Sequence, residues 1–250
     1  MRRTLLAWLA LALATLSTSV AAQDYAREKR WADEVVPDLV VGDAVWLKQS
    51  NGHELLGLYT QAKNAKAAVL MVHGMGVQPD FSFFGPLRSG LADMGYSTLS
   101  IQMPVLAADA KPADYHPKLF PDAIERIALG ERWLAAKGYS RIVLLSHSLG
   151  SWMSQAYFAR TPNAPFAAWV CLGRGGDFDG LKNVKVPVLD VYGDHDLPPV
   201  MKAAAQRRAA LEKIPGSSQV VIAGTDHFYN GKESELQALV SRFIAREVTK

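Results

Sequence analysis

The sequence has little cysteine, no cluster of like charges and no long stretch rich in serine, glycine or proline. Cys171 is the sole cysteine among 250 residues, so the chain cannot form an internal disulfide. It lies in the apolar run FAAWVCLG, which favours a packed thiol over a reactive one. The 27 basic and 24 acidic side chains are interspersed. Without a basic stripe carrying interleaved aromatic residues, a nucleic-acid partner is not expected.

The first 22 residues have the composition of a secretory signal peptide. Arg2 and Arg3 precede the apolar run TLLAWLALALATLSTSV, and small residues follow up to Ala22. This is the order of a basic region, an apolar core and a cleavage site. We predict cleavage after Ala22, with Ala21 as the alternative, and therefore a periplasmic or secreted protein. The apolar run is short for a membrane span, so we expect no stable membrane span after cleavage.

Residues 23–250 alternate between apolar runs of strand length and helical segments. The run AAVLMV at 67–72, and RIVLLS at 141–146 after its first residue, are continuously apolar or small, as expected for strands buried on both faces. The pair Asn51-Gly52 between two short apolar runs predicts a hairpin at one edge. We therefore predict a single α/β domain. Its architecture would be a three-layer α/β/α sandwich around a mostly parallel eight-stranded sheet.

The stretch SHSLG at Ser146–Gly150 joins a predicted buried strand directly to a helix. A serine on such a sharp turn is exposed above the sheet and needs small neighbours, usually in the pattern Gly-x-Ser-x-Gly. Gly150 fits this pattern, whereas Ser146 replaces the leading glycine. The following helix directs its positive N-terminus at the turn, where an oxyanion would form. These five residues alone fit a reactive Ser148 and a simple strand–helix turn equally well.

Further polar residues follow other predicted strands. His73–Gly76, Asp194–Asp196 and Thr225–His227 each come directly after an apolar run. Because the carboxyl ends of parallel strands meet on one side of a sheet, we expect these segments to lie near Ser148. A serine nucleophile needs a base, and the base needs an orienting acid. The chain order Ser, Asp, His is the one found in the α/β-hydrolase fold.

On these motifs the chain resembles the α/β-hydrolase superfamily over essentially its whole mature length. The resemblance is to exported, uncharacterised bacterial serine hydrolases and, more loosely, to dienelactone-hydrolase-like members. It implies that Ser148 is the nucleophile and that His227 is the general base. It also implies that Asp196, in the pattern Gly-x-x-Asp, is the orienting acid, with Asp194 as the competing choice.

The same resemblance implies that the backbone amides of Met75, in HGM, and of Leu149 hold the oxyanion. It calls for no cofactor and no metal, and the compact sequence Asp-His-Asp at 194–196 is a weak metal signal. His195 is interpreted as a solvated loop residue, with a second base as the alternative. For His73 the interpretation is a hydrogen bond to the loop backbone, and for His147 it is packing or shaping of the pocket.

The sequence marks the substrate only coarsely. The segment 173–185 is too short for a lid domain, so we expect an open site covered at most by the long loop 105–121. Phe81–Phe84, in FSFF, either line an acyl pocket or pack in the core. The predicted reaction is hydrolysis of a small-molecule ester or related acyl bond through an acyl-enzyme. Two alternatives stay open: a non-catalytic binding or assembly protein on the same scaffold, and a peptidase or amidase.

Overall fold

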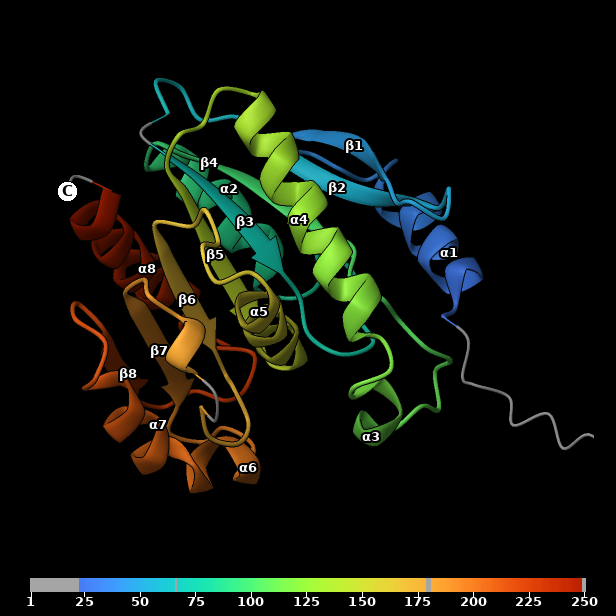
Figure 1. Ribbon diagram of the computed structural model, residues 1–250. Coiled ribbons are helices and arrows are strands. Elements are labelled where there is room, and N and C mark those ends of the chain that lie inside the picture. Colours follow the sequence, from blue (N-terminus) through green and yellow to red (C-terminus); the bar gives the residue numbers. More distant parts are fainter. Residues whose placement is uncertain (1–22, 66, 179–180, 249–250) are drawn as a thin grey trace, which may run out of the picture.

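One twisted sheet organises the molecule (Figure 1). The computed structural model describes residues 23–65, 67–178 and 181–248, and the predicted signal peptide lies outside these residues. The strands are β1 (Asp43–Lys48), β2 (Glu54–Thr60), β3 (Ala67–Val72), β4 (Tyr96–Ile101), β5 (Ile142–His147), β6 (Ala168–Leu172), β7 (Val188–Gly193) and β8 (Ser218–Ile222). They form an eight-stranded sheet in the order β1-β2-β4-β3-β5-β6-β7-β8.

The pairing of the strands confirms the predicted fold class. β1 and β2 form an antiparallel hairpin around Asn51-Gly52, and β2 pairs antiparallel with β4. All other neighbours are parallel. β3, β4, β5, β6 and β7 are buried at every position. Both faces of these strands are therefore covered, which is why they appear in the sequence as continuous rather than alternating apolar runs.

Helices form the two outer layers. They are α1 (Tyr25–Val35), α2 (Phe84–Asp93), α3 (Pro112–Tyr115), α4 (Phe120–Ala136), α5 (Leu149–Arg160), α6 (Pro198–Lys202), α7 (Ala204–Leu211) and α8 (Glu233–Val248). In β3, Ala68, Leu70 and Val72 pack in one core with α4 and α5. The intervening residues of the strand pack on the opposite face with α2 and α8. The alternation of side chains along a strand thus builds two cores, one on each face of the sheet. The helices that cover these faces are seen in Figure 1.

Two further features frame the site. The connection from β6 to β7 carries the 3₁₀ helix η1 (Leu181–Asn183), and the described part of the chain holds no lid domain there, as predicted. α1 packs on the outer hairpin, where Ala32 lies in a small core with Leu56 and Leu58.

No helix within residues 23–65, 67–178 and 181–248 is long and apolar enough to cross a membrane.

Candidate functional site

Ser148 lies at the carboxyl end of β5 on a strained turn. It is the N-cap of α5 with φ 53° and ψ −122°, a positive φ that is uncommon for a residue other than glycine. The turn demands close approach of the backbone around it. A Cβ atom on Gly150 would lie 2.4 Å from the carbonyl oxygen of His73, and one on Gly74 would lie 3.1 Å from the Cβ of Ser148. The turn therefore requires the trailing glycine of the motif.

The structure brings Ser148, His227 and Asp196 together from three strand ends. His227 Nε2 lies 3.0 Å from Ser148 Oγ, and His227 Nδ1 lies 2.6 Å from Asp196 Oδ1. A carboxylate only accepts hydrogen bonds, so Nδ1 carries the proton and Nε2 is left to accept from the serine hydroxyl. Asp196 Oδ1 also accepts from the amide of Leu197 at 2.7 Å. Asp196 and His227 are both buried, which keeps this chain of hydrogen bonds away from water.

Asp194 lies in the same loop but faces another partner. Its Oδ1 accepts from the amides of Gly224 at 2.7 Å and Thr225 at 3.3 Å. Asp194 thus ties the β7 loop to the β8 loop, while Asp196 contacts His227. His195 is a largely exposed loop residue whose ring lies 3.7 Å from Asp194, away from the Ser148–His227 pair.

The two predicted oxyanion residues lie next to residues of the turn: Leu149 directly follows Ser148, and Met75 directly follows Gly74, which packs against Ser148. Leu149 is the first residue of α5, and the first amides of a helix have no partner inside it. Met75 lies between Gly74 and Gly76 in the loop after β3 and is 36% exposed. The amide of Ser148 itself donates to the carbonyl of Leu172 at 2.8 Å. The amides of Leu149 and Met75, in contrast, belong to the two backbone segments that meet at the serine.

His73 is buried and hydrogen-bonds the loop backbone, as predicted. One ring nitrogen, Nδ1, lies 2.8 Å from the carbonyl oxygen of Gly74 and therefore donates to it. The other, Nε2, accepts from the amide of Met103 at 2.8 Å. Burial lowers the pKa of His73 to about 4, so the ring is neutral with its proton on Nδ1. This tautomer lets His73 support the loop that carries Met75.

His147 holds the backbone of His227, a contact that the sequence did not reveal. Its Nε2 donates to the backbone carbonyl of His227 at 2.9 Å, and the two rings lie 4.6 Å apart. Burial and the neighbouring His227 lower the pKa of His147 to about 3. Phe83 packs edge-on against the His147 ring at 5.1 Å. A neutral, tightly packed imidazole thus holds the loop that positions His227.

The FSFF segment divides between core and site. Phe83 and Phe84 are buried in the core beside α2. Phe81 is 41% exposed and packs edge-on against Phe228, whose ring lies next to His227. Only Phe81 of this segment therefore presents apolar surface near His227.

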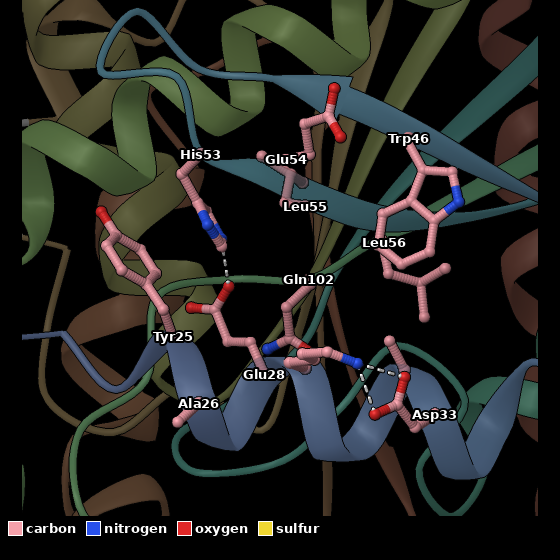
Figure 2. Close-up of a pocket in the computed structure, with 12 residues that line it drawn as sticks. Tyr25, Ala26, Glu28, Asp33, Trp46, His53, Glu54, Leu55, Leu56 and Gln102 are labelled. Carbon is pink, nitrogen blue, oxygen red and sulfur yellow. Dashed lines mark hydrogen bonds and ion pairs between the residues drawn. The ribbon is translucent and has the colours of Figure 1, made fainter.

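Other candidate sites lie away from Ser148. A cavity of about 610 Å³ opens between α1 and the β1–β2 hairpin, and Figure 2 shows Tyr25, His53 and Trp46 among the residues around it. Its lining does not include Ser148. Among the residues that the structure describes, no three His, Cys, Asp or Glu side chains are grouped so as to hold a metal ion.

The sequence matches one family model over part of its length. Residues 5–125, slightly less than half of the chain, match the family described as "Protein of unknown function (DUF3530)". No match was found among curated proteins.

Comparison of the structure gives many matches to α/β hydrolases. The chain is similar to an esterase from Pyrococcus furiosus, with a TM-score of 0.68 and 14% identity over 86% of this chain and 96% of that one. It is similar to an α/β serine hydrolase without a lid from Xanthomonas campestris, with a TM-score of 0.66 and 15% identity over 83% and 95%. It is also similar to a dienelactone hydrolase from Anabaena variabilis, with a TM-score of 0.65 and 23% identity over 82% of this chain and 96% of that one. The chain has the α/β-hydrolase fold, which confirms the predicted resemblance at the level of fold.

Proposed function

We propose that this protein is a serine hydrolase that cleaves an ester or related acyl bond through an acyl-enzyme. The observation that carries the proposal is the continuous hydrogen-bonded chain from Ser148 through His227 to Asp196, with the serine on a strained turn. Strain at a single non-glycine residue is retained where the position of that side chain matters. A scaffold that had lost catalysis would have no need to keep all three partners within hydrogen-bond distance.

The proposed mechanism follows from these contacts. Ser148 Oγ attacks the carbonyl carbon of the substrate while its proton passes to His227 Nε2, and Asp196 stabilises the resulting imidazolium. The oxyanion of the tetrahedral intermediate accepts from the amides of Met75 and Leu149, each worth about 3 kcal/mol in comparable sites. His227 then gives its proton to the departing alcohol, which leaves the acyl group on Ser148. A water molecule, deprotonated by His227, attacks the acyl-enzyme and releases the acid.

The surroundings of Ser148 favour a small ester with an apolar acyl group. Phe81 and Phe228 offer apolar surface beside His227, and the short β6–β7 connection leaves the site open. The loop 105–121 supplies the neighbouring wall, where His116 packs against Trp152 of α5. A shallow site of this kind covers a short acyl chain better than a long one. The structural similarity to a protein described as an esterase supports an ester as the substrate.

Domain organisation and location form part of the same proposal. Residues 23–250 would constitute one catalytic domain, exported to the periplasm or beyond after removal of residues 1–22. No feature of the described residues favours a peptidase or a binding protein over an esterase.

A fluorophosphonate probe tests the proposed nucleophile directly, because it forms a stable adduct only with an activated serine. We expect labelling of the folded mature protein, with the adduct on Ser148 in the tryptic peptide 142–160. That peptide also contains Ser146, Ser151 and Ser154, so fragment sequencing must locate the adduct. Labelling elsewhere, or none at all in the folded protein, would exclude Ser148 as an activated nucleophile.

A further inference from the structure

α1 reaches the walls of the proposed active site through one side chain. Arg27 donates from Nη1 to the carbonyl of Leu106 at 2.8 Å and from Nη2 to the carbonyl of Gly76 at 3.2 Å. Its guanidinium lies 4.5 Å from the ring centre of Trp31, one turn along α1. The amide of Asp24, the N-cap of the helix, donates to the carbonyl of Val105 at 2.8 Å. α1 therefore clamps both the loop after β3 and the start of the loop 105–121.

The next residue of the same helix, Glu28, begins a second series of contacts, which ends at the loop after β3. Glu28 is buried, and its two carboxylate oxygens each lie 3.1 Å from a guanidinium nitrogen of the buried Arg126 on α4. His53 Nε2 lies 2.9 Å from the same carboxylate, and a dashed line marks this contact in Figure 2. Arg126 Nη1 also donates to the backbone carbonyl of Gln102 at 3.0 Å. Removal of one partner of such a buried pair is strongly destabilising, so Glu28 fixes α1 in place.

From Gln102 the contacts continue to the loop. Its side-chain nitrogen lies 3.1 Å from His73 Nε2, and the following amide, that of Met103, donates to the same ring nitrogen. His73 Nδ1 in turn donates to the carbonyl of Gly74. That carbonyl and the N–H of Met75 belong to one planar peptide group. A hydrogen bond that fixes the direction of the carbonyl therefore fixes the direction of the Met75 N–H.

These two series of contacts hold the carbonyls on both sides of Met75: Arg27 holds that of Gly76, and His73 holds that of Gly74. The loop needs such support because Gly74 and Gly76 flank Met75, and Gly76 has a positive φ of 67°. Glycine leaves the backbone free to rotate, whereas an oxyanion donor stabilises a transition state only when it is preorganised. We infer that α1 positions the Met75 amide, and that Arg27 is a positioning residue for the hydrolysis. This inference rests on the proposed function.

Arg27 contacts no reacting atom in this arrangement, so its loss should affect the chemical steps more than substrate binding. Displacement of a donor by about 1 Å costs up to about a hundredfold in rate. Because acylation and deacylation both pass through an oxyanion, both steps should slow together. We therefore expect kcat to fall by about tenfold to a hundredfold in Arg27→Ala, with KM within about twofold of wild type.

The experiment compares Arg27→Ala and Arg27→Lys with Arg30→Ala, in the mature protein. Arg30 is an exposed arginine on the same helix, so its variant controls for the loss of a charge and of helical arginine. Arg27→Lys keeps the charge but has all its donors on one nitrogen and lacks the planar guanidinium that spans the two carbonyls, so it should give an intermediate kcat. If Arg27→Ala does not fold, the kcat of Arg27→Lys decides the test instead. Readouts are kcat and KM for p-nitrophenyl acetate, the thermal unfolding midpoint, and the low-field proton resonance of His227 Nδ1–H bonded to Asp196.

The inference predicts a reduced kcat in both Arg27 variants, unchanged KM, an intact His227 resonance, and wild-type kinetics in Arg30→Ala. A kcat within twofold of wild type in Arg27→Ala, or in Arg27→Lys where the alanine variant is unfolded, would overturn it. Loss of the His227 resonance together with kcat would also overturn it, because the effect would then be general disruption of the site. Absence of Ser148-dependent turnover in the wild type would refute the proposed function, and this inference with it.

Discussion

The indole of Trp169 donates to Ser146 Oγ at 2.7 Å, between the neighbouring strands β6 and β5. Both residues are fully buried, and a buried indole N–H needs an acceptor. Ser146 occupies the position before the Ser148 turn where glycine is usual in the pattern Gly-x-Ser-x-Gly. The serine at this position is therefore explained by a partner in the core, since glycine could not accept from Trp169.

This contact predicts that Ser146 serves stability and not catalysis. Ser146→Ala leaves the Trp169 N–H unpaired and should lower the free energy of unfolding by about 1–3 kcal/mol, measured by urea denaturation. Its kcat should remain close to wild type. Ser154→Ala is the matched control, because Ser154 Oγ is buried on α5 with no partner among the described residues and its loss should cost little. A stability change in Ser154→Ala as large as that in Ser146→Ala would contradict the account.

Asp196 and Asp194 lie two residues apart and are predicted to behave very differently. Asp196→Asn removes the carboxylate that fixes the His227 tautomer and should lower kcat by about 10⁴. Asp194→Asn retains an oxygen that can accept from Gly224 and Thr225, so its kcat should stay near that of wild type. Steady-state ester hydrolysis by the two variants, with unfolding midpoints as a check, decides the assignment. If Asp194→Asn lost more activity than Asp196→Asn, the roles would be reversed.

The buried His147 should make the protein less stable in mild acid. Its pKa is about 3 in the fold and about 6.5 when unfolded. The unfolded chain therefore binds one more proton between these values, and the free energy of unfolding falls as the pH drops below about 6.5. The expected slope from this one group is up to about 1.4 kcal/mol per pH unit. His73, with a pKa of about 4, acts in the same direction.

The test of this slope is urea denaturation between pH 7 and 4.5. His147→Gln keeps a side-chain donor for the His227 carbonyl but does not titrate, so its stability should depend less on pH. His195→Gln is the control, because the His195 side chain is 73% exposed and its replacement should leave the slope unchanged. Equal slopes in wild type and His147→Gln would show that His147 is not the group responsible.

Phe81 is predicted to contribute to the choice of acyl group. Phe81→Ala removes apolar surface beside Phe228 and should raise KM for p-nitrophenyl butyrate more than for the acetate, with kcat little changed. Met94→Ala is the control. Met94 is 39% exposed, close to the 41% of Phe81. It precedes β4 and so lies at the amino ends of the parallel strands, opposite to the end that carries Ser148. If Phe81→Ala left the ratio of KM for the butyrate to KM for the acetate unchanged, Phe81 would not contact the acyl group.

Local sequence patterns were sufficient to predict the sheet and the residues that meet at one edge of it. Buried strands appear as apolar runs, and parallel topology brings the ends of β5, β7 and β8 together whatever the intervening residues are. The strand pattern alone does not choose between Asp196 and Asp194, and the prediction of Asp196 came from the Gly-x-x-Asp pattern of the superfamily that the chain resembles. Both follow the same strand, and only the path of the turn directs one to His227 and the other to the β8 loop.

The contacts of α1 were equally inaccessible. Arg27 meets Leu106 across 79 residues, and Glu28 meets Arg126 across 98. No periodicity or motif connects positions so far apart, because these pairs depend on where the whole hairpin and the loop 105–121 pack. The contact of His147 was inaccessible for the same reason. Its place beside Ser148 is visible in the sequence, but its hydrogen-bond partner is the backbone carbonyl of His227, 80 residues away.

The most direct test of the central claim is p-nitrophenyl ester hydrolysis by the mature protein and its Ser148→Ala variant, assayed together over a range of acyl lengths. The account predicts measurable turnover in the wild type, greatest for short acyl chains, and turnover at the level of the buffer reaction in Ser148→Ala with an unchanged unfolding midpoint. Equal turnover in the two proteins would contradict the account, because the reaction would then not pass through Ser148.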